Sequence, residues 1–237
     1  MHPNDDGSRD HHAPLLAALD EWFGKSKGGY DFWKIGKLMA AADTASYFEK
    51  HMLTTPLFGS RVKLHNAIFP KREIPGLIME FGVAGGRSIN RLAKLFPADK
   101  VYGFDSFEGL PEAWRTDYQK SHFAQAVPKT LANVELVIGW FNETLPGFLG
   151  QHEADVSILH VDCDLYSSTK TIFGLLGDRI KPGTLIVFDE YFNYPGWREH
   201  EHKAFMEFIA GSGLGYEYLG AVRSNKQVAV RIIDRNA

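Results

Sequence analysis

The sequence predicts an α/β fold, a doubly wound and mostly parallel sheet of Rossmann-like type with a helical cap before it. After Pro75, short apolar runs alternate with helical segments, which is the pattern of parallel strands joined by crossover helices. Near the end of the chain, two β-rich runs flank the polar turn Ser224-Asn225-Lys226, which predicts an antiparallel hairpin. A parallel sheet with an antiparallel edge is a permitted mixed sheet.

Residues 1–70 are expected to form an N-terminal helical cap, and residues 71–237 the main domain. Apolar residues recur at helical spacing in three segments of the cap, within 15–23, 35–42 and 62–68. Gly28-Gly29 and Thr55-Pro56 separate these segments as helix breakers.

The main domain is expected to contain seven strands, five parallel ones and the two of the hairpin. The parallel strands are continuous apolar runs, so we expect cover on both faces of the sheet. The predicted strands are Leu77–Val83, Val101–Phe104, Val134–Ile138, Val156–Val161, Leu185–Phe188, Tyr216–Val222 and Gln227–Ile233. Helices are predicted to begin near Ser88, Ser121, Glu143 and Ser168, and a last one to run from Arg198 to Ile209.

Composition excludes several classes of protein. The chain has 237 residues and a formal net charge of −3, so no overall positive field favours nucleic acid as a partner. A lone Cys163 excludes an internal disulfide and fits a reducing cytosol. No run reaches the roughly 18 apolar residues that suggest a membrane span, and Met1–Asp10 lacks the apolar core of a secretory signal. We therefore expect a soluble cytoplasmic protein without a membrane or nucleic-acid partner.

A glycine-rich loop closes the first parallel strand and opens a helix. Its residues Gly82, Gly85, Gly86 and Ser88 let the backbone turn sharply and offer free N–H groups to a ligand. The spacing differs from the Gly-x-Gly-x-x-Gly of dinucleotide sites, and the carboxylate of Glu80 would repel a pyrophosphate. S-adenosylmethionine carries an ammonium and a sulfonium but no phosphate, so Glu80 suits its ammonium end. The alternative is an ordinary glycine turn capped by Ser88.

Two further strand ends are expected to complete a cofactor site. Asp105 ends the second parallel strand, where a carboxylate accepts hydrogen bonds from ribose hydroxyls, and it lies 19 residues after Gly86. Ser106 and Phe107 follow it in the same predicted site. After the third strand come Gly139, Trp140 and Phe141, a candidate wall for the adenine ring. Core packing of the two aromatic residues is the competing interpretation.

An acidic cluster is predicted where the next two strands end side by side. Asp162 follows one strand, and Asp189 and Glu190 follow the other. Clustered carboxylates repel unless a cation or protons neutralise them, and Mg²⁺ is the candidate metal for this set. Asp164 is left out because it is a candidate cap of the following helix. The competing interpretation is that these carboxylates bond strand-end amides and that Asp162 contacts the cofactor.

With these residues placed, the sequence resembles the macrocin O-methyltransferase family of class I S-adenosylmethionine-dependent methyltransferases. The specific pieces are Glu80–Gly86, the string Asp105-Ser106-Phe107-Glu108-Gly109-Leu110-Pro111, and Asp162-x-Asp164 with Asp189-Glu190. The resemblance implies the seven-stranded methyltransferase fold, O-methylation of a hydroxyl on a sugar or other small metabolite, Mg²⁺, and a homo-oligomer. By position, Asp162, Asp189 and Glu190 match the metal ligands. This chain has Cys163 where the family has glycine, and Glu190 where it has aspartate.

Methyl transfer to oxygen is an in-line displacement, so a catalytic site must place the hydroxyl and remove its proton. The candidate catalytic residues are Asp162, through a bound metal, and the bases His160 and His200. Three competing functions remain open: N-methylation of a small amine, a non-catalytic cofactor-binding subunit, and a nicotinamide-dependent oxidoreductase. The glycine spacing and Glu80 argue against the last.

Overall fold

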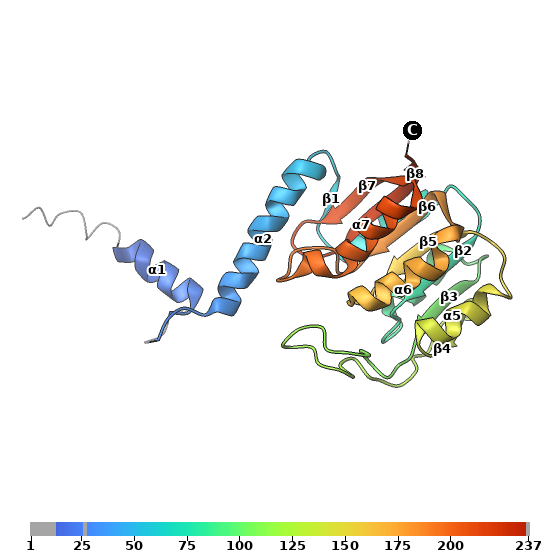
Figure 1. Cartoon of the computed structure of the whole chain (residues 1–237), viewed down its shortest axis with the longest axis horizontal. Coiled ribbons are helices and arrows are strands. Elements are labelled where there is room, and N and C mark those ends of the chain that lie inside the picture. The colour runs from blue at the N-terminus through green and yellow to red at the C-terminus, as the bar shows by residue number, and fades with distance from the viewer. Residues whose placement is uncertain (1–12, 26–27, 236–237) are drawn as a thin grey trace, which may run out of the picture.

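The computed structural model describes residues 13–25 and 28–235, so the polar stretch Met1–Asp10 lies outside the described residues. It contains one sheet of eight strands in the order β1-β7-β8-β6-β5-β2-β3-β4 (Figure 1). The doubly wound, mostly parallel fold and the C-terminal hairpin are therefore confirmed. The predicted count of seven strands is wrong by one, because Leu57–Phe58 forms a short strand, β1, that pairs in parallel with β7.

The remaining strands lie close to their predicted positions. They are β2 (Leu77–Phe81), β3 (Val101–Asp105), β4 (Val134–Ile138), β5 (Val156–Val161), β6 (Ile180–Phe188), β7 (Leu214–Val222) and β8 (Val228–Asp234). Strand β8 is antiparallel to both β6 and β7, and the other pairs are parallel. The carboxyl ends of the central parallel strands thus meet along one edge of the sheet, where ligands of such folds bind.

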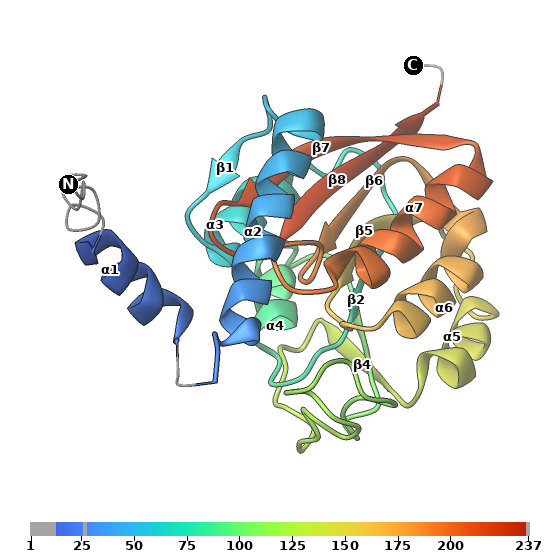
Figure 2. The same cartoon turned by 60° about the vertical axis from the view of Figure 1, so that its left-hand side comes forward.

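Helices cover both faces of the sheet (Figures 1 and 2). Their bounds are α1 (Ala13–Phe23), α2 (Phe32–His51), α3 (Arg61–Ile68), α4 (Arg87–Leu95), α5 (Phe141–Leu149), α6 (Tyr166–Leu176) and α7 (Glu201–Ser212), with short 3₁₀ turns at Phe69–Lys71, Gly177–Arg179 and Trp197–Glu199. One apolar core lies between the sheet and α2, α5, α6 and α7, and a smaller one between the sheet and α3 and α4. Helix α1 stands away from the rest of the molecule (Figure 1).

The helix predicted near Ser121 is wrong. Residues 106–133 form an irregular loop between β3 and β4, in which Ser121 and Phe123 have positive φ angles of 64° and 72°. Backbone in that region does not continue a right-handed helix. Leu110 and Trp114 of this loop join the larger core, whereas Phe123, Val127 and Leu131 are exposed.

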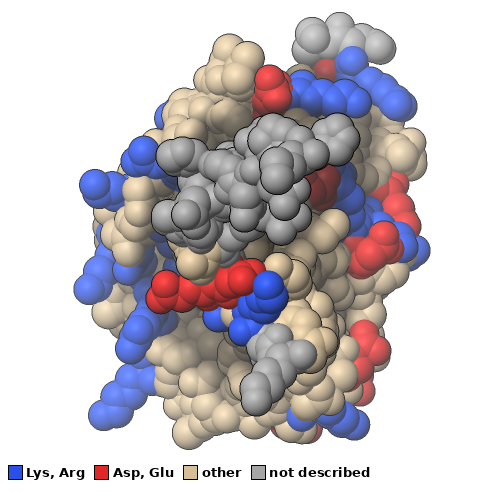
Figure 3. Space-filling model, turned by 90° about the vertical axis from the view of Figure 1, so that its left-hand side faces the viewer, with Lys and Arg blue, Asp and Glu red and all other residues tan. Residues whose placement is uncertain are grey.

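No helix among the described residues is long and apolar enough to cross a membrane. The face of the molecule in Figure 3 carries both acidic and basic side chains.

Candidate active site

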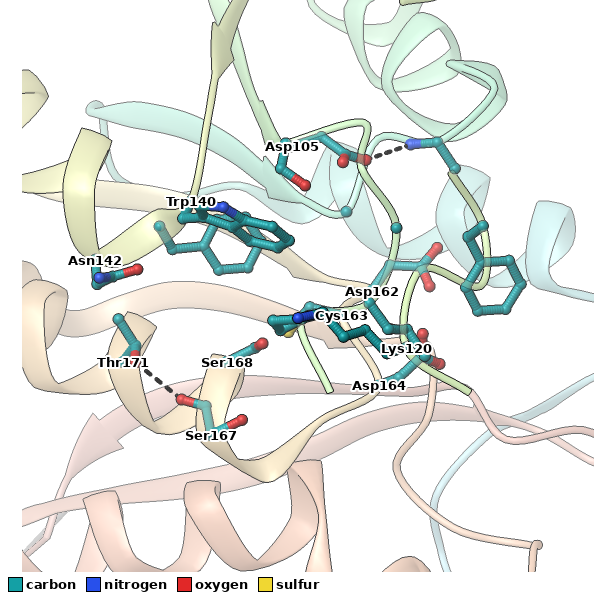
Figure 4. Close-up of a pocket in the computed structure, with 18 of the residues that line it drawn as sticks. Asp105, Lys120, Trp140, Asn142, Asp162, Cys163, Asp164, Ser167, Ser168 and Thr171 are labelled. Carbon is teal, nitrogen blue, oxygen red and sulfur yellow. Dashed lines mark hydrogen bonds between the residues drawn. The ribbon is translucent and has the colours of Figure 1, made fainter. Parts of the chain in front are cut away.

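A cavity of about 790 Å³ opens at the carboxyl edge of the sheet. Its wall combines the ends of β2, β3 and β5 with the start of α5, the first turns of α6 and the loop 106–133 (Figure 4). Two sides can be distinguished. Asp105 and Trp140 lie at one side, and Asp162 and Asp164 lie at the other (Figure 4). The carboxylate of Glu190 lines the cavity together with those of Asp162 and Asp164. We call these three the outer carboxylates.

The glycine loop has the tight geometry that the sequence predicts. Gly82 has a φ of 90°, and a Cβ there would collide with the backbone carbonyl of Asp162. Only glycine therefore lets the ends of β2 and β5 approach this closely. Gly86, with a φ of 73°, precedes the first residue of α4 and makes no side-chain cap.

Asp105 links the glycine loop to the end of β3. Its Oδ2 accepts hydrogen bonds from the backbone N–H groups of Val83 (2.9 Å) and Ala84 (2.8 Å), and its Oδ1 accepts one from Phe107 (2.7 Å). A carboxylate has about four acceptor positions, so one remains for a ligand hydroxyl. Asp105 thus shapes the loop and faces the cavity at the same time (Figure 4).

The structure divides the predicted cofactor residues into two groups. Gly82, Asp105, Ser106, Trp140, Phe141 and Asp162 line the cavity, whereas Glu80, Gly85, Gly86, Ser88, Phe107 and Gly139 do not. The second group supports the wall from behind, since Phe107 packs in the core on the α4 side and Gly86 begins the helix.

Glu80 is turned away from the cavity and is fully buried. Its Oε1 accepts a hydrogen bond from Ser88 Oγ at 2.9 Å, and its Oε2 lies 2.9 Å from His160 Nδ1. Glu80 and His160 are directly paired across β2 and β5, so the sheet register brings them together. A direct contact between Glu80 and a cofactor ammonium has no support in this arrangement.

Neither histidine predicted as a base lines the cavity. His160 is fully buried behind it. His200 directly precedes α7, and its ring packs against the rings of Trp114 and Tyr194 at centroid distances of 6.0 Å.

The residues predicted to bind one metal ion lie on two sides of the sheet edge. Adjacent residues in a strand point to opposite faces, and Asp189 and Glu190 directly follow β6. Asp189 turns toward α3, where Arg61 Nη1 lies 3.1 Å from its Oδ2 and 3.7 Å from Asp162 Oδ2. Glu190 turns to the cavity, with Lys226 Nζ 2.6 Å from its Oε2. Asp162 and Asp189 therefore share a guanidinium, and Glu190 has its own ammonium.

Asp164 faces the cavity instead of capping α6. The N-cap of that helix is Leu165 and has no side-chain hydrogen bond, so the predicted capping role is wrong. Burial raises the pKa of Asp164 to about 7 and that of Glu190 to about 8, although Lys226 opposes both shifts. Desolvation and the neighbouring carboxylate of Asp189 also raise the pKa of Asp162. These carboxyl groups therefore keep their protons to a higher pH than exposed ones do.

With this geometry in view, comparisons with known proteins decide the family. The family model of macrocin O-methyltransferase (TylF) matches residues 61–208, more than half of the chain. The chain belongs to this family. Its cofactor is therefore S-adenosylmethionine, the methyl donor of the class I methyltransferases to which the TylF family belongs.

Among curated proteins, a relative is the 8-demethyl-8-(2,3-dimethoxy-α-L-rhamnosyl)-tetracenomycin-C 4′-O-methyltransferase of Streptomyces olivaceus, 32% identical over 143 residues. That match covers 50% of this chain and 54% of the relative, so the chain spans about half the length of the curated protein. Among solved structures, the calicheamicin methyltransferase CalS11 has a TM-score of 0.58 at 20% identity, covering 98% of this chain and 94% of its own. The O-methyltransferase NovP has a TM-score of 0.57 at 21% identity, covering 74% and 80%. These structures share the fold.

A buried carboxylate that sequence reasoning missed holds the two acidic strand ends of this TylF-family protein together. Glu201, fully buried at the start of α7, accepts a hydrogen bond from the backbone N–H of Asp164 (3.2 Å) and another from that of Glu190 (3.0 Å). One side chain therefore sets the spacing of two outer carboxylates. Its only sequence signal is an acidic residue in the first helical turn, which is common at helix starts.

Sequence reasoning also missed several other residues that line the cavity. Lys120 and Tyr118 come from the loop 106–133, and Asn142, Ser168 and Thr171 come from helices. Lys120 is exposed, and Figure 4 shows it reaching into the cavity beside Asp162 and Asp164. No local pattern marks it, because its place depends on how the loop folds back over the sheet edge.

Proposed function

We propose that this TylF-family protein transfers a methyl group from S-adenosylmethionine to a hydroxyl of a sugar-containing acceptor. The observation that carries the proposal is the division of the cavity, with Asp105 and Trp140 on one side and Asp162 and Asp164 on the other (Figure 4). One side suits the nucleoside of the cofactor, and the other suits a hydroxyl that must lose a proton.

On the cofactor side, Asp105 accepts a hydrogen bond from one ribose hydroxyl and Trp140 stacks on the adenine. The three backbone N–H groups that already bond Asp105 keep its carboxylate aimed at the loop, so little rearrangement is needed when the cofactor enters. Gly82 lets the ends of β2 and β5 approach closely at the cavity, because a Cβ there would collide with the carbonyl of Asp162.

On the acceptor side, the residues orient the hydroxyl for in-line attack on the methyl carbon and receive its proton. Asp164 is the proposed proton acceptor, because it faces the cavity and burial raises its pKa to about 7, near the value that suits a general base at neutral pH. The C–S bond of the sulfonium breaks as the O–C bond forms, and the products are the methyl ether, S-adenosylhomocysteine and the protonated base. Glu201 holds the backbone of Asp164 in place.

The outer carboxylates fit a hard divalent cation by donor type, since all are oxygen ligands. Arg61 pairs with Asp162, and Lys226 pairs with Glu190. Mg²⁺ needs only one or two protein carboxylates when water and substrate oxygens complete its shell. Asp162 and Glu190 would hold it, and it would lower the pKa of a coordinated hydroxyl. Asp189 is not part of this set, because it does not line the cavity: its Oδ2 bonds Arg61 and Gln227, and its Oδ1 lies 4.0 Å from His160 Nε2.

The class of acceptor follows from the relatives. The curated relative is named for methylation of a rhamnosyl group, and CalS11 is described as a TDP-rhamnose 3′-O-methyltransferase. A deoxysugar, free on a nucleotide or attached to a polyketide, is therefore the first acceptor to test. Homo-oligomerisation and a cytoplasmic location stay predictions, which sedimentation and cell fractionation would check.

The first experiment is calorimetric titration with S-adenosylhomocysteine, with and without Mg²⁺, on the wild type and on Asp105→Ala. We expect micromolar binding that weakens by at least about 100-fold in the variant, since it loses the ribose acceptor and leaves three backbone N–H groups unpaired. Turnover of TDP-rhamnose and rhamnosylated polyketides would then be followed by mass spectrometry. If S-adenosylhomocysteine does not bind under either condition, the proposed function is wrong.

A further inference from the structure

Behind the outer carboxylates lies a second group of polar side chains, formed by Glu80, His65, His160 and Asp189, which we call the inner polar cluster. Each is at most 5% exposed. Both ring nitrogens of His65, Nε2 of His160 and Oδ1 of Asp189 have no hydrogen-bond partner among the described residues. Buried polar atoms in folded proteins nearly always have partners, so four such atoms in one place call for an explanation.

These atoms converge. One ring nitrogen of His65, one of His160 and one oxygen of Asp189 lie within 4.8 Å of one another, and His160 Nε2 lies 4.0 Å from Asp189 Oδ1. Elsewhere among the described residues, no other three histidine, cysteine or acidic side chains bring their ligand atoms together in this way. The three residues come from α3, β5 and the end of β6, so the tertiary fold creates the group.

Glu80 determines which ring nitrogen of His160 carries the proton. Its Oε2 lies 2.9 Å from His160 Nδ1, so Nδ1 carries the proton that is donated to the carboxylate. The lone pair of His160 is then on Nε2, the atom that faces Asp189 and His65. A carboxylate bonded to the far nitrogen of a histidine is the usual outer-shell partner of a metal-binding imidazole.

The local charge also favours a cation. Glu80, Asp162 and Asp189 contribute three carboxylates, and Arg61 is the one cationic side chain that pairs with any of them in the described structure. Since Arg61 and Gln227 bond Oδ2 of Asp189, Oδ1 stays available on the side of the histidines. Glu80 and Asp189 are buried, whereas the side chain of Asp162 is 25% exposed at the cavity. Buried negative charge is costly, and a divalent cation would offset it.

We propose that His65, His160 and Asp189 bind a divalent transition metal, with Zn²⁺ as the leading candidate. Two imidazole nitrogens and one carboxylate oxygen suit Zn²⁺ or Fe²⁺, whereas Mg²⁺ prefers oxygen ligands alone. Metal bonds of about 2.0–2.2 Å place tetrahedral ligand atoms about 3.4 Å apart, so the donors must each move inward by less than about 1 Å. The ion would tie α3 to the ends of β5 and β6, behind the cavity.

The test uses the full chain, stripped with a chelator and titrated with Zn²⁺ by calorimetry and with Co²⁺ by visible absorption. We expect one equivalent of Zn²⁺ to bind with submicromolar affinity, and millimolar Mg²⁺ not to displace it. The variant His65→Phe should bind at least about 100-fold more weakly, whereas His51→Phe, the same change at an exposed histidine, should bind as the wild type does.

His65→Phe should also fold, because it replaces a buried ring without partners by an apolar ring of similar shape beside Phe69. X-ray absorption at the zinc edge of the wild type gives a readout that needs no variant, and it should show two imidazole ligands. Equal zinc binding by His65→Phe, absorption spectra without imidazole, or no binding by the stripped wild type would each overturn the proposal. None of these measurements depends on methyl transfer, so they fail independently of the proposed function.

Discussion

The carboxyl edge of the sheet holds two polar groups that differ in one respect, their access to the cavity. The outer carboxylates line the cavity, where Arg61 pairs with Asp162 and Lys226 pairs with Glu190. The inner polar cluster is buried behind them. Glu80 bonds Ser88 and His160, Asp189 bonds Arg61 and Gln227, and the remaining ring nitrogens and Oδ1 of Asp189 have no partner among the described residues. Residues that are neighbours in sequence fall into different groups, as Asp189 and Glu190 do.

This difference in access predicts that the outer carboxylates act in catalysis and that the inner polar cluster contributes to stability. A carboxylate that faces a cavity can change partners as substrate arrives, so changing it should alter catalysis more than stability. A charged group without access to solvent depends on fixed partners, so changing it should lower stability first. The four predictions below test this division.

The largest effect is expected at Glu80. Glu80→Gln removes a buried charge that holds Ser88 and His160, and should lower the free energy of unfolding by about 3 kcal/mol in urea titrations. Ser88→Ala removes only one of these bonds and should cost about 1 kcal/mol. Equal, small losses in both variants would show that Glu80 is not the centre of the inner polar cluster.

Asp164→Asn should show the opposite pattern. We expect kcat/KM for methyl transfer to fall about 30-fold, equivalent to about 2 kcal/mol in the barrier, because the amide cannot accept the proton. Stability should stay constant or rise, since the carboxylate is buried at a cost that raises its pKa. The exposed Asp155→Asn is the control. Loss of stability without loss of activity would place Asp164 with the inner polar cluster.

The pH dependence of stability is the third test. Burial raises the pKa of Glu190 to about 8, above its unfolded value, so the folded state holds this proton more tightly and stability falls as pH rises toward 8. The groups facing Glu190 are Lys226, Asp164, Asp189 and Glu201.

Without divalent metal, we expect a loss of about 1 kcal/mol between pH 7 and 8.5, measured by chemical unfolding. Glu190→Gln should remove most of this slope, and Glu153→Gln, an exposed change, should keep it. An unchanged slope in Glu190→Gln would assign the titration to another group.

The smallest effect is expected at Lys120, an exposed ammonium in the cavity wall. Lys120→Met should raise KM about threefold for a nucleotide-linked sugar and leave KM for a neutral glycoside unchanged, because only the former carries phosphate charge. Steady-state kinetics with the two acceptors measure the difference. Equal changes in KM for both would show that Lys120 contributes packing and not charge.

Sequence reasoning was most successful where local pattern and sheet topology agree. The continuous apolar runs identified the central strands, and the strand ends carried Gly82, Asp105 and Asp162 to one cavity. It failed for the loop 106–133, where a helix was predicted to begin near Ser121 and the backbone is irregular. Hydrophobic periodicity predicts which residues are buried, but it does not predict the path of the backbone between them.

The amino-acid sequence by itself determined the class of fold, the glycine turn, the acidic strand ends and the family, because each depends on residues close together in the chain. Only the tertiary structure decided which of these residues lie in contact with one another. The register of β2 against β5 directs Glu80 to His160, and the alternation at the end of β6 separates Asp189 from Glu190. Helix α3 then adds Arg61 and His65 from outside the predicted main domain. These choices depend on long-range packing and strand pairing, which no local pattern encodes.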